Sequence, residues 1–380
     1  MRKTIFCMVM ATALSASAVV AWADRGLVVD RLAAKEFVRL PDGIRFPEGI
    51  TANPDTGDIF VATFDFGGTN KLLRFSGNGK LLAQRDFGGT PLLGLAYTRT
   101  DDKVYICNTG DLVGSQSRIQ RIPADFNADA PIEEVAFLPH IGPPPDRTVD
   151  NPDGSQDVIR FGDNASAPNA MAFRSDGSLF VSDSFQGAIF QIENVAMCAG
   201  SCTVTTFGHD PLLATAGFPP FGANGIAFSP DEKSIFIANT GDDRILRMDS
   251  GTKNVESFAE SINGADGIAF DSSGNLWVAA NQADEVVVLD GNGRVVAKFG
   301  DFLGIREDGA PRGLLFPASI VFSRDSAFVT NLSLPLTSAA GDEPEEDVRL
   351  YTVSRIKVPE AFSQPHYMPR SLAGSKEGTP

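Results

Sequence analysis

One short pattern of residues recurs six times along this chain and limits the folds that the chain can adopt. In each copy a polar loop leads into an apolar strand, a tight turn follows, and a second apolar strand comes next, as in residues 264–280. The first strands begin at or just after Glu48, Leu93, Asn169, Asn224, Asp266 and Ala318. Copies that repeat with a period of roughly 40–55 residues, apart from insertions, are typical of β-propellers.

Each copy holds about four short strands, which is the content of one propeller blade. A single blade cannot bury both of its faces, so neighbouring blades must cover it and the ring must close. The sixth copy lacks an outer strand after residues 349–353, while residues 36–40 form an alternating strand without a hairpin partner. The sequence therefore predicts an all-β, six-bladed β-propeller over residues 24–356, closed by an N-terminal strand that removes an exposed sheet edge. A two-domain arrangement is disfavoured because no linker interrupts the repeat.

The two ends of the chain differ from the repeat. Residues 1–23 combine Arg2 and Lys3 with an apolar run through Val20 and small residues, the pattern of a secretory signal peptide. The apolar run is short for a membrane span, and an uncleaved anchor is the alternative. We expect a periplasmic or secreted protein with no membrane span after signal cleavage, and a C-terminal tail over residues 357–380.

The formal net charge is -16. Such an acidic chain argues against nucleic acid or an anionic membrane as a partner, because both carry negative charge. Acidity favours solubility and cation binding, although we expect most of the carboxylates to lie on the solvated surface.

The cysteines and histidines narrow the chemistry further. Cys198 and Cys202 lie close together in the sequence, and in an oxidising compartment we expect them to form a disulfide. A metal pair is the alternative, but no third thiol or nearby histidine supports it. Cys107 lies in an apolar strand and is expected to be a buried free thiol. The chain has only three histidines, in loops or in the tail, which disfavours a zinc site or a Ser-His-Asp triad.

An oxygen-bearing side chain precedes the first strand in four of the six copies. In a propeller this strand lines the channel, so the residue before it lies at the channel mouth and points toward the axis. The equivalent residues in the second and sixth copies are Leu93 and Ala318, which makes one side of the ring apolar. We expect the four polar side chains to converge; they are Glu48, Asn169, Asn224 and Asp266.

Two carboxylates and two amide oxygens are hard ligands that suit Ca²⁺, with Mg²⁺ or Mn²⁺ as alternatives. Without a cation the two carboxylates would repel each other. For any single residue the competing interpretation is a turn role, because Asn and Asp are common turn residues. A further polar set at the end of the second strands either orients the metal ligands or caps its own turns; its members are Asn108, Asp183, Asn239 and Asn331.

Three insertions, at residues 139–167, 209–223 and 301–317, each precede the first strand of a blade. They should therefore emerge on one face of the ring. Long loops on one face of a rigid scaffold usually carry binding, and the alternative is that they only cap the channel.

These motifs resemble the gluconolactonase, senescence marker protein and luciferin-regenerating enzyme family. The likeness rests on Pro-Glu-Gly at 47–49, Asn-Gly-Ile-Ala-Phe at 224–228 and Asp-Gly-Ile-Ala-Phe at 266–270. Each is followed by a Leu/Ile-aromatic-Val/Ile triplet in the next strand. The resemblance covers most of the chain, from about Glu48 to Val329.

The resemblance implies a six-bladed propeller that binds one divalent cation, usually calcium, in its channel. It implies Glu48, Asn224 and Asp266 as metal ligands, Asn169 as a contact to metal or substrate, and Asp266 as the general base. The implied activity is hydrolysis of a lactone or related cyclic ester, a small-molecule substrate. No substrate-specific motif is present, and the strictosidine-synthase-like and arylesterase groups share the frame. The alternative is a non-catalytic propeller that binds a ligand or partner and holds a structural calcium ion.

Overall fold

The computed structural model describes residues 26–111, 116–163, 165–198, 200–336 and 343–363. The expected signal peptide and residues 364–380 of the expected tail lie outside this part of the chain. The last described residues pack against the ring: β29 ends at Lys357, and the buried Phe362 contacts Trp277 and Phe299.

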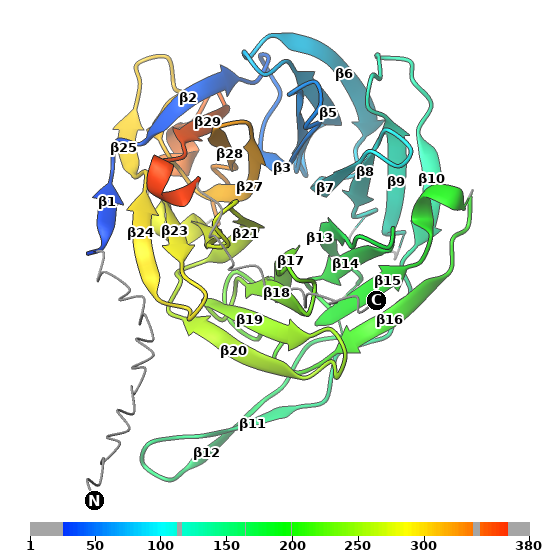
Figure 1. Cartoon of the computed structure of the whole chain (residues 1–380), viewed down its shortest axis with the longest axis vertical. Helices are drawn as coiled ribbons and strands as arrows, with labels where there is room; N and C mark the ends of the chain where they lie inside the picture. The colour runs from blue at the N-terminus through cyan, green and yellow to red at the C-terminus, as the bar shows by residue number, and fades with distance from the viewer. Residues whose placement is uncertain (1–25, 112–115, 164, 199, 337–342, 364–380) are drawn as a thin grey trace, which may run out of the picture.

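The strands form six sheets around a central channel (Figure 1). Blade 1 contains β3 (Pro47–Ala52), β4 (Ile59–Thr63), β5 (Asn70–Phe75) and β6 (Leu81–Gly88), and blade 2 contains β7 (Leu92–Thr98), β8 (Lys103–Asn108), β9 (Arg118–Pro123) and β10 (Glu133–Phe137). Blade 3 contains β13 (Pro168–Phe173), β14 (Leu179–Asp183), β15 (Ala188–Ile192) and β16 (Val204–His209), and blade 4 contains β17 (Ala223–Phe228), β18 (Ser234–Asn239), β19 (Arg244–Asp249) and β20 (Val255–Glu260). Blade 5 contains β21 (Ala265–Phe270), β22 (Leu276–Ala280), β23 (Glu285–Leu289), β24 (Val295–Phe299) and β1 (Val28–Asp30), and blade 6 contains β27 (Pro317–Ser323), β28 (Ser326–Asn331), β29 (Thr352–Lys357) and β2 (Ala34–Arg39).

The N-terminal strand closes the ring. β2 pairs antiparallel with β29, and Ala34 lies opposite Ile356. The prediction of a six-bladed propeller closed by an N-terminal strand is therefore confirmed. The strand β1 was not expected; it adds to the outer edge of blade 5 in parallel with β24. Within the described residues, two β-hairpins and four short 3₁₀ segments complete the regular structure: β11 (Arg147–Asp150) with β12 (Gln156–Ile159), β25 (Phe302–Ile305) with β26 (Pro311–Gly313), η1 (Val195–Met197), η2 (Asn281–Ala283), η3 (Pro344–Asp347) and η4 (Glu360–Phe362).

The innermost strand of every blade carries an irregularity at the same place. In β17 the pairing with β18 skips from Ala223 to Ile226, and the other five inner strands show the same shift. A β-bulge re-aims the side chains of the residues that it takes out of the ladder. The two residues in each bulge include the one that the sequence places at the channel mouth, so the bulge sets the direction of that side chain.

Glycine in four of these bulges lets neighbouring inner strands approach closely. A Cβ atom on Gly225 would lie 2.3 Å from the carbonyl oxygen of Asp266, and one on Gly94 would lie 2.2 Å from that of Asn169. In the two remaining bulges, in blades 3 and 6, the second residue is not glycine, and a hydroxyl from the next strand of the same blade reaches the following blade instead. Thr330 Oγ1, for example, donates to the carbonyl oxygen of Glu48 at 2.7 Å and joins blade 6 to blade 1.

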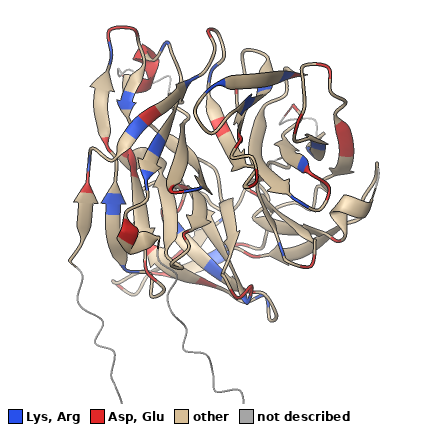
Figure 2. Cartoon of the chain, turned by 45° about the horizontal axis from the view of Figure 1, so that its top comes forward, with Lys and Arg blue, Asp and Glu red and all other residues tan. Residues whose placement is uncertain are grey.

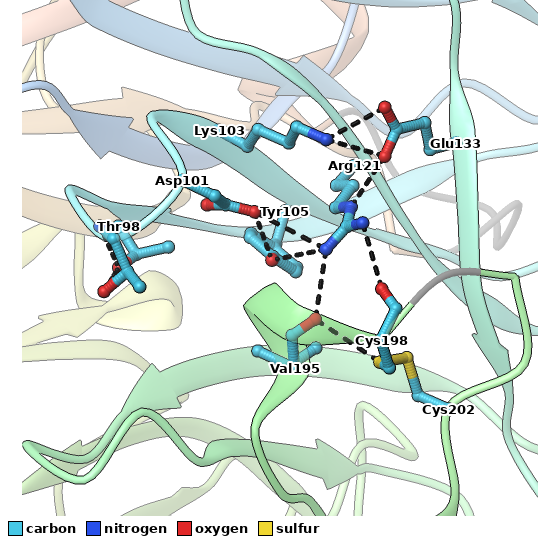
Figure 3. Close-up of polar contacts among 10 residues, drawn as sticks. Thr98, Asp101, Lys103, Tyr105, Arg121, Glu133, Val195, Cys198 and Cys202 are labelled. Carbon is cyan, nitrogen blue, oxygen red and sulfur yellow. Dashed lines mark hydrogen bonds and ion pairs between the residues drawn. A yellow bond between two sulfur atoms is a disulfide. The ribbon is translucent and has the colours of Figure 1, made fainter.

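A polar network ties blade 2 to blade 3 (Figure 3). The guanidinium of Arg121 in β9 donates to the carbonyl oxygens of Val195 and Cys198 in blade 3, at 3.0 and 3.1 Å. The same side chain binds Tyr105 and Glu133 of its own blade. The segment that it holds is closed by the disulfide between Cys198 and Cys202, as predicted from the sequence.

Charges of both signs are spread over the blades and loops (Figure 2). The apolar side chains instead fill the spaces between blades, where Trp277, Tyr105 and Phe180 are fully buried. Cys107 is buried and free, as predicted, and burial raises the pKa of its thiol. No helix in the described part of the chain is long and apolar enough to cross a membrane.

Candidate metal centre

The structure brings the four predicted oxygen-bearing side chains into one pocket at the channel mouth. Glu48 lies in β3, Asn169 in β13, Asn224 in β17 and Asp266 in β21, each inside the bulge of its blade. All four are buried, with 2–5% of their surface exposed. Leu93 of β7 lines the same pocket on the apolar side. The convergence that the repeat predicted is therefore present.

Neighbouring hydroxyl groups fix the orientation of both amides. The Nδ2 group of Asn224 donates to Thr240 Oγ1 at 2.9 Å, and that hydroxyl donates to the carbonyl oxygen of Ala265 at 2.7 Å. Because the only proton of the hydroxyl is committed, its oxygen must accept from the amide nitrogen. The Asn224 amide oxygen is thereby left for another partner.

Asn169 is held in the same way. Its Nδ2 group donates to Ser184 Oγ at 2.9 Å, and Ser184 Oγ donates to the carbonyl oxygen of Ala223 at 2.8 Å. In both cases the hydroxyl residue directly follows the second strand of the blade and reaches the next blade. The same contacts that join the blades thus orient the two amides.

Three oxygen atoms at this site are buried without a hydrogen-bond partner among the described residues. Asn281 donates from Nδ2 to Asp266 Oδ2 at 3.1 Å, which leaves Asp266 Oδ1 and Asn281 Oδ1 unpaired, together with Glu48 Oε2. A buried polar atom without a partner costs about 1–3 kcal/mol, and more when it is charged. Asn281 Oδ1 packs against Gly264, which does not line the pocket. The two unpaired carboxylate oxygens therefore indicate a ligand that accepts lone pairs, which is the property of a cation.

The electrostatics of the two carboxylates agree with this. Burial raises the pKa of Glu48 well above its usual value, and the nearby Asp266 carboxylate raises it further. Burial raises the pKa of Asp266 to about 7, although hydrogen bonds from Asn281 and Asn224 oppose the shift. Ionisation of two neighbouring buried carboxyl groups is unfavourable, and it becomes favourable when a divalent cation neutralises their charge.

The residues present fit a hard divalent cation. The donors are carboxylate and amide oxygens, which Ca²⁺ prefers and Mg²⁺ or Mn²⁺ accepts. The open volume between them is about 30 Å³, which is room for about two water molecules, or for one ion with water. The described residues contain no group of three or more His, Cys, Asp or Glu arranged to hold a metal; this site has two carboxylates, and its other donors are amides.

The second predicted polar set does not reach the site. Asp183 accepts hydrogen bonds from the backbone of Ala167, Phe185 and Gln186, and Asn239 donates to the carbonyl oxygens of Leu212 and Ala214. Asn108 and Asn331 likewise bind groups of their own blades. The observed contacts agree with the alternative that these side chains brace turns and loops. The expectation that they orient the metal ligands is not met for any of the four, Asn108, Asp183, Asn239 and Asn331.

The residues that do orient the site lie one position later in the chain. Ser184 follows Asp183, Thr240 follows Asn239, and Asn281 follows Ala280 at the end of β22. Side chains alternate between the two faces of a strand, so a shift of one residue changes the neighbour that a side chain meets. The signal available in the sequence was a small polar residue at one fixed position after the second strand.

Apolar side chains form the rest of the pocket wall. Leu93 belongs to the bulge of β7, and the others come from segments that precede the first strand or follow the second strand of a blade. The apolar residues of the wall include Phe64, Leu93, Phe221, Phe316, Leu334 and Leu336. Two of the three predicted insertions supply part of this wall, through Phe221 and Phe316. The third insertion instead contains the β11–β12 hairpin, which projects away from the ring (Figure 1), and none of its residues is in the wall.

Comparison with known proteins supports the resemblance over part of the chain. Residues 219–300 match a family model described as SMP-30/Gluconolactonase/LRE-like region. This segment includes Asn224 and Asp266 and ends after blade 5. No curated protein matches the chain.

Several solved structures share the fold at low sequence identity. A luciferin-regenerating enzyme is 14% identical with a TM-score of 0.57, and the match covers 86% of this chain and 97% of that one. Regucalcin from Agrobacterium tumefaciens, described as a calcium-binding protein, is 16% identical with a TM-score of 0.56, over 90% and 99% of the two chains. A streptogramin B lyase is 13% identical with a TM-score of 0.52, over 87% and 100%.

The likeness to solved structures shows a shared fold. The match to the family model shows that one segment, residues 219–300, has the sequence pattern of that family. The chain is therefore a six-bladed β-propeller that carries an SMP-30/gluconolactonase/LRE-like region at residues 219–300.

Proposed function

We propose that this protein is a divalent-cation-dependent hydrolase of lactones or related cyclic esters, with calcium as the first candidate cation. The observation that carries the proposal is the pair of buried, unpaired carboxylate oxygens, Glu48 Oε2 and Asp266 Oδ1, at the mouth of the channel. The match of residues 219–300 to a family that is named in part for gluconolactonase supports it. Fold alone does not select a reaction, so the site carries the argument.

Glu48, Asn169, Asn224 and Asp266 would hold the cation, which supplies Lewis-acid polarisation of a substrate carbonyl when bound. The residues of the chain do the rest. Asn281 donates to Asp266 Oδ2 and so fixes the carboxylate that would accept a proton from an attacking water. Thr240 and Ser184 keep the amide oxygens aimed into the site, and the apolar wall excludes bulk water from it.

The test combines substitution with chelation. Asp266→Ala and Asp266→Asn should each lower kcat/KM for a lactone substrate by at least about a hundredfold, because general-base catalysis contributes 10²–10⁴. Chelation should have a comparable effect on the wild type that added Ca²⁺ reverses. Asp129→Asn, on an exposed turn of blade 2, is the matched control. Lactonase activity that survives both chelation and loss of Asp266 would exclude this function.

The rival is a non-catalytic binding propeller with a structural calcium ion. The small open volume of about 30 Å³ at the site favours it, because little room remains once an ion and water are present. Cation-dependent thermal stabilisation without turnover of aliphatic, sugar or aromatic lactones would support this second function.

We also propose export to the periplasm or the medium. The signal-like pattern of residues 1–23 and the Cys198–Cys202 disulfide support export. Cell fractionation with N-terminal sequencing tests it, and a mature protein that begins at Asp24 is the expected result. A full-length protein retained in the cytoplasm would contradict it.

A further inference from the structure

The lining of the pocket combines two kinds of chemistry. Part of it carries the unpaired oxygens of the candidate metal centre, and large apolar side chains make up most of the rest. Phe64, Leu93, Phe316 and Leu332 belong to one buried cluster, against which Phe221, Leu334 and Leu336 pack. Loops of blades 1, 4 and 6 therefore place hydrocarbon surface beside the oxygens where the reacting carbonyl would lie.

The polar groups of the pocket have little left to offer a hydroxylated ligand. The Thr240 hydroxyl is committed to Asn224 and to the carbonyl oxygen of Ala265, and one N–H of the Asn281 amide is committed to Asp266. The unpaired carboxylate oxygens, Glu48 Oε2 and Asp266 Oδ1, are the atoms that would bind the cation. A hydroxyl group buried against the apolar wall would lose its water without gaining a partner, which is unfavourable.

The apolar surface continues outward from the site. A second cavity of about 190 Å³ shares Asn281, Phe316, Leu334 and Leu336 with the first. On the adjoining blade 1, Phe66 is 59% exposed and packs edge-on against Phe64, with 4.6 Å between ring centroids. A substituent longer than the reacting ring would therefore meet hydrocarbon on its way to solvent.

Carboxylates also line the second cavity, directly beside the apolar wall, since Asp284 accepts a hydrogen bond from the backbone of Phe316 and Glu343 from that of Leu336. Asp284, Glu343 and Glu345 lie there, and burial raises the pKa of Asp284 to about 6. Their negative charge disfavours a ligand with a carboxylate or phosphate at its outer end. The substituent that fits this cavity is accordingly free of negative charge and largely apolar.

We propose that the substrate carries an apolar alkyl or aryl group beside the reactive ring, and that polyhydroxylated sugar lactones are poor substrates. This inference rests on the lactonase function proposed above and specifies its substrate class. In the reaction water adds a hydroxyl group to the carbonyl carbon, the ring carbon–oxygen bond breaks, and the released alkoxide oxygen takes a proton to give a hydroxy acid.

A chain-length series tests the proposal in the presence of Ca²⁺. For γ-lactones with alkyl substituents of increasing length, kcat/KM should rise about fourfold for each of the first few methylenes, as expected for burial of a CH₂ group. A hexose δ-lactone should be hydrolysed more slowly than the alkyl lactones. A flat series, or a preference for the sugar lactone, would overturn the inference while leaving the lactonase function intact.

Failure of the lactonase function itself is recognised by a different result. If no lactone is hydrolysed, the corresponding cyclic amides, which resist hydrolysis, are titrated calorimetrically with and without Ca²⁺. Affinity that rises with alkyl length supports the apolar recognition even without turnover. Affinity that does not change with length overturns it.

Two variants locate the effect. Leu336→Asn places an amide in the apolar wall and should reduce the fold-change per methylene from about fourfold toward one. Leu82→Asn changes a half-exposed leucine on the outer strand β6 and should leave the chain-length series unaltered. Melting temperatures confirm that both proteins are folded. An unchanged series in Leu336→Asn would place the substituent elsewhere and contradict the proposal.

Discussion

At the scale of single residues, the site depends on two acidic side chains that the fold buries without a basic partner at hydrogen-bond distance. Glu48 Oε2 and Asp266 Oδ1 have no hydrogen-bond partner among the described residues, and burial raises the pKa of both groups. Such an arrangement is unfavourable for the protein without its cation. Two buried carboxylates are compatible with a stable fold when a bound cation contributes more free energy than the burial of the carboxylates costs.

The first prediction concerns pH and follows from the raised pKa values. Because the folded state of the cation-free protein binds these protons more tightly than the unfolded chain, its free energy of unfolding should be highest near pH 4. It should fall as the pH rises to about 7, the pKa of Asp266, by a few kcal/mol. Urea unfolding in chelator from pH 4 to 8 measures this decline.

Added Ca²⁺ should reverse the slope, because the cation binds the ionised carboxylates. The double variant Glu48→Gln with Asp266→Asn is the control, and its stability should vary much less with pH and with Ca²⁺. A wild-type protein whose stability increases over this pH range in chelator would show that the two carboxylates ionise freely.

The second prediction concerns the hydroxyl that orients Asn224. Thr240→Val removes the acceptor of the amide nitrogen while keeping the shape of the side chain. Calcium affinity should fall about 10–100-fold, the usual cost of losing a group that orients a ligand. Calorimetric titration measures the affinity, and Thr206→Val on the exposed face of β16 is the control. Equal affinities in the two variants would mean that the Asn224 oxygen does not bind the ion.

At the scale of elements, the inner strands are the parts that build the site. Each is interrupted by a bulge, and glycine in four of the bulges brings the next strand close. The motif Asn-Gly-Ile-Ala-Phe therefore has a physical meaning at each position. The first residue points into the channel, the glycine lies against the neighbouring backbone, and the apolar residues pack between blades.

The third prediction belongs to this scale. Gly225→Ala would place a Cβ atom 2.3 Å from the carbonyl oxygen of Asp266, so β17 and β21 must move apart. The free energy of unfolding should fall by about 1–3 kcal/mol, as for other overpacked sites, and calcium affinity should fall with it. Gly89→Ala is the control, because a Cβ atom there has no neighbour within 4 Å. Equal stability of the two variants in urea would show that the blades tolerate the shift.

At the scale of the whole molecule, the ring is held by contacts between blades as well as by the β2–β29 pairing. Arg121 is the clearest such contact among the described residues, because its buried guanidinium spans blades 2 and 3 beside the disulfide (Figure 3). Blade-to-blade contacts of this kind keep the inner strands at fixed distances from the axis. We therefore expect the geometry at the channel mouth to depend on them.

The fourth prediction compares two arginines. Arg121→Met leaves the carbonyl oxygens of Val195 and Cys198 without donors, and the free energy of unfolding should fall by about 2–3 kcal/mol. Arg247→Met removes a surface ion pair with Glu256, whose side chains are 43% and 58% exposed. That loss should be below about 1 kcal/mol. Urea denaturation of both variants decides it, and a larger loss in Arg247→Met would contradict the role given to Arg121.

The repeat made much of this protein predictable from its sequence. Hydrophobic strands at a regular period require neighbouring blades to cover one another, so the closed six-bladed ring and the partner of the N-terminal strand followed from pattern alone. The convergence of Glu48, Asn169, Asn224 and Asp266 followed as well, because equivalent positions in a ring face a common axis. These features depend on local patterning, which a sequence displays directly.

Only the tertiary structure decided the rest. Ser184, Thr240 and Asn281 orient the site through contacts to other strands and to the next blade, and a one-residue offset along a strand separates them from the residues that the sequence suggested. The apolar wall is formed by side chains of separate blades. The carboxylate oxygens are unpaired because no donor of another strand lies within hydrogen-bond distance in the described part of the chain. Such properties arise from distances between residues far apart in the chain, and those distances exist only once the ring has closed.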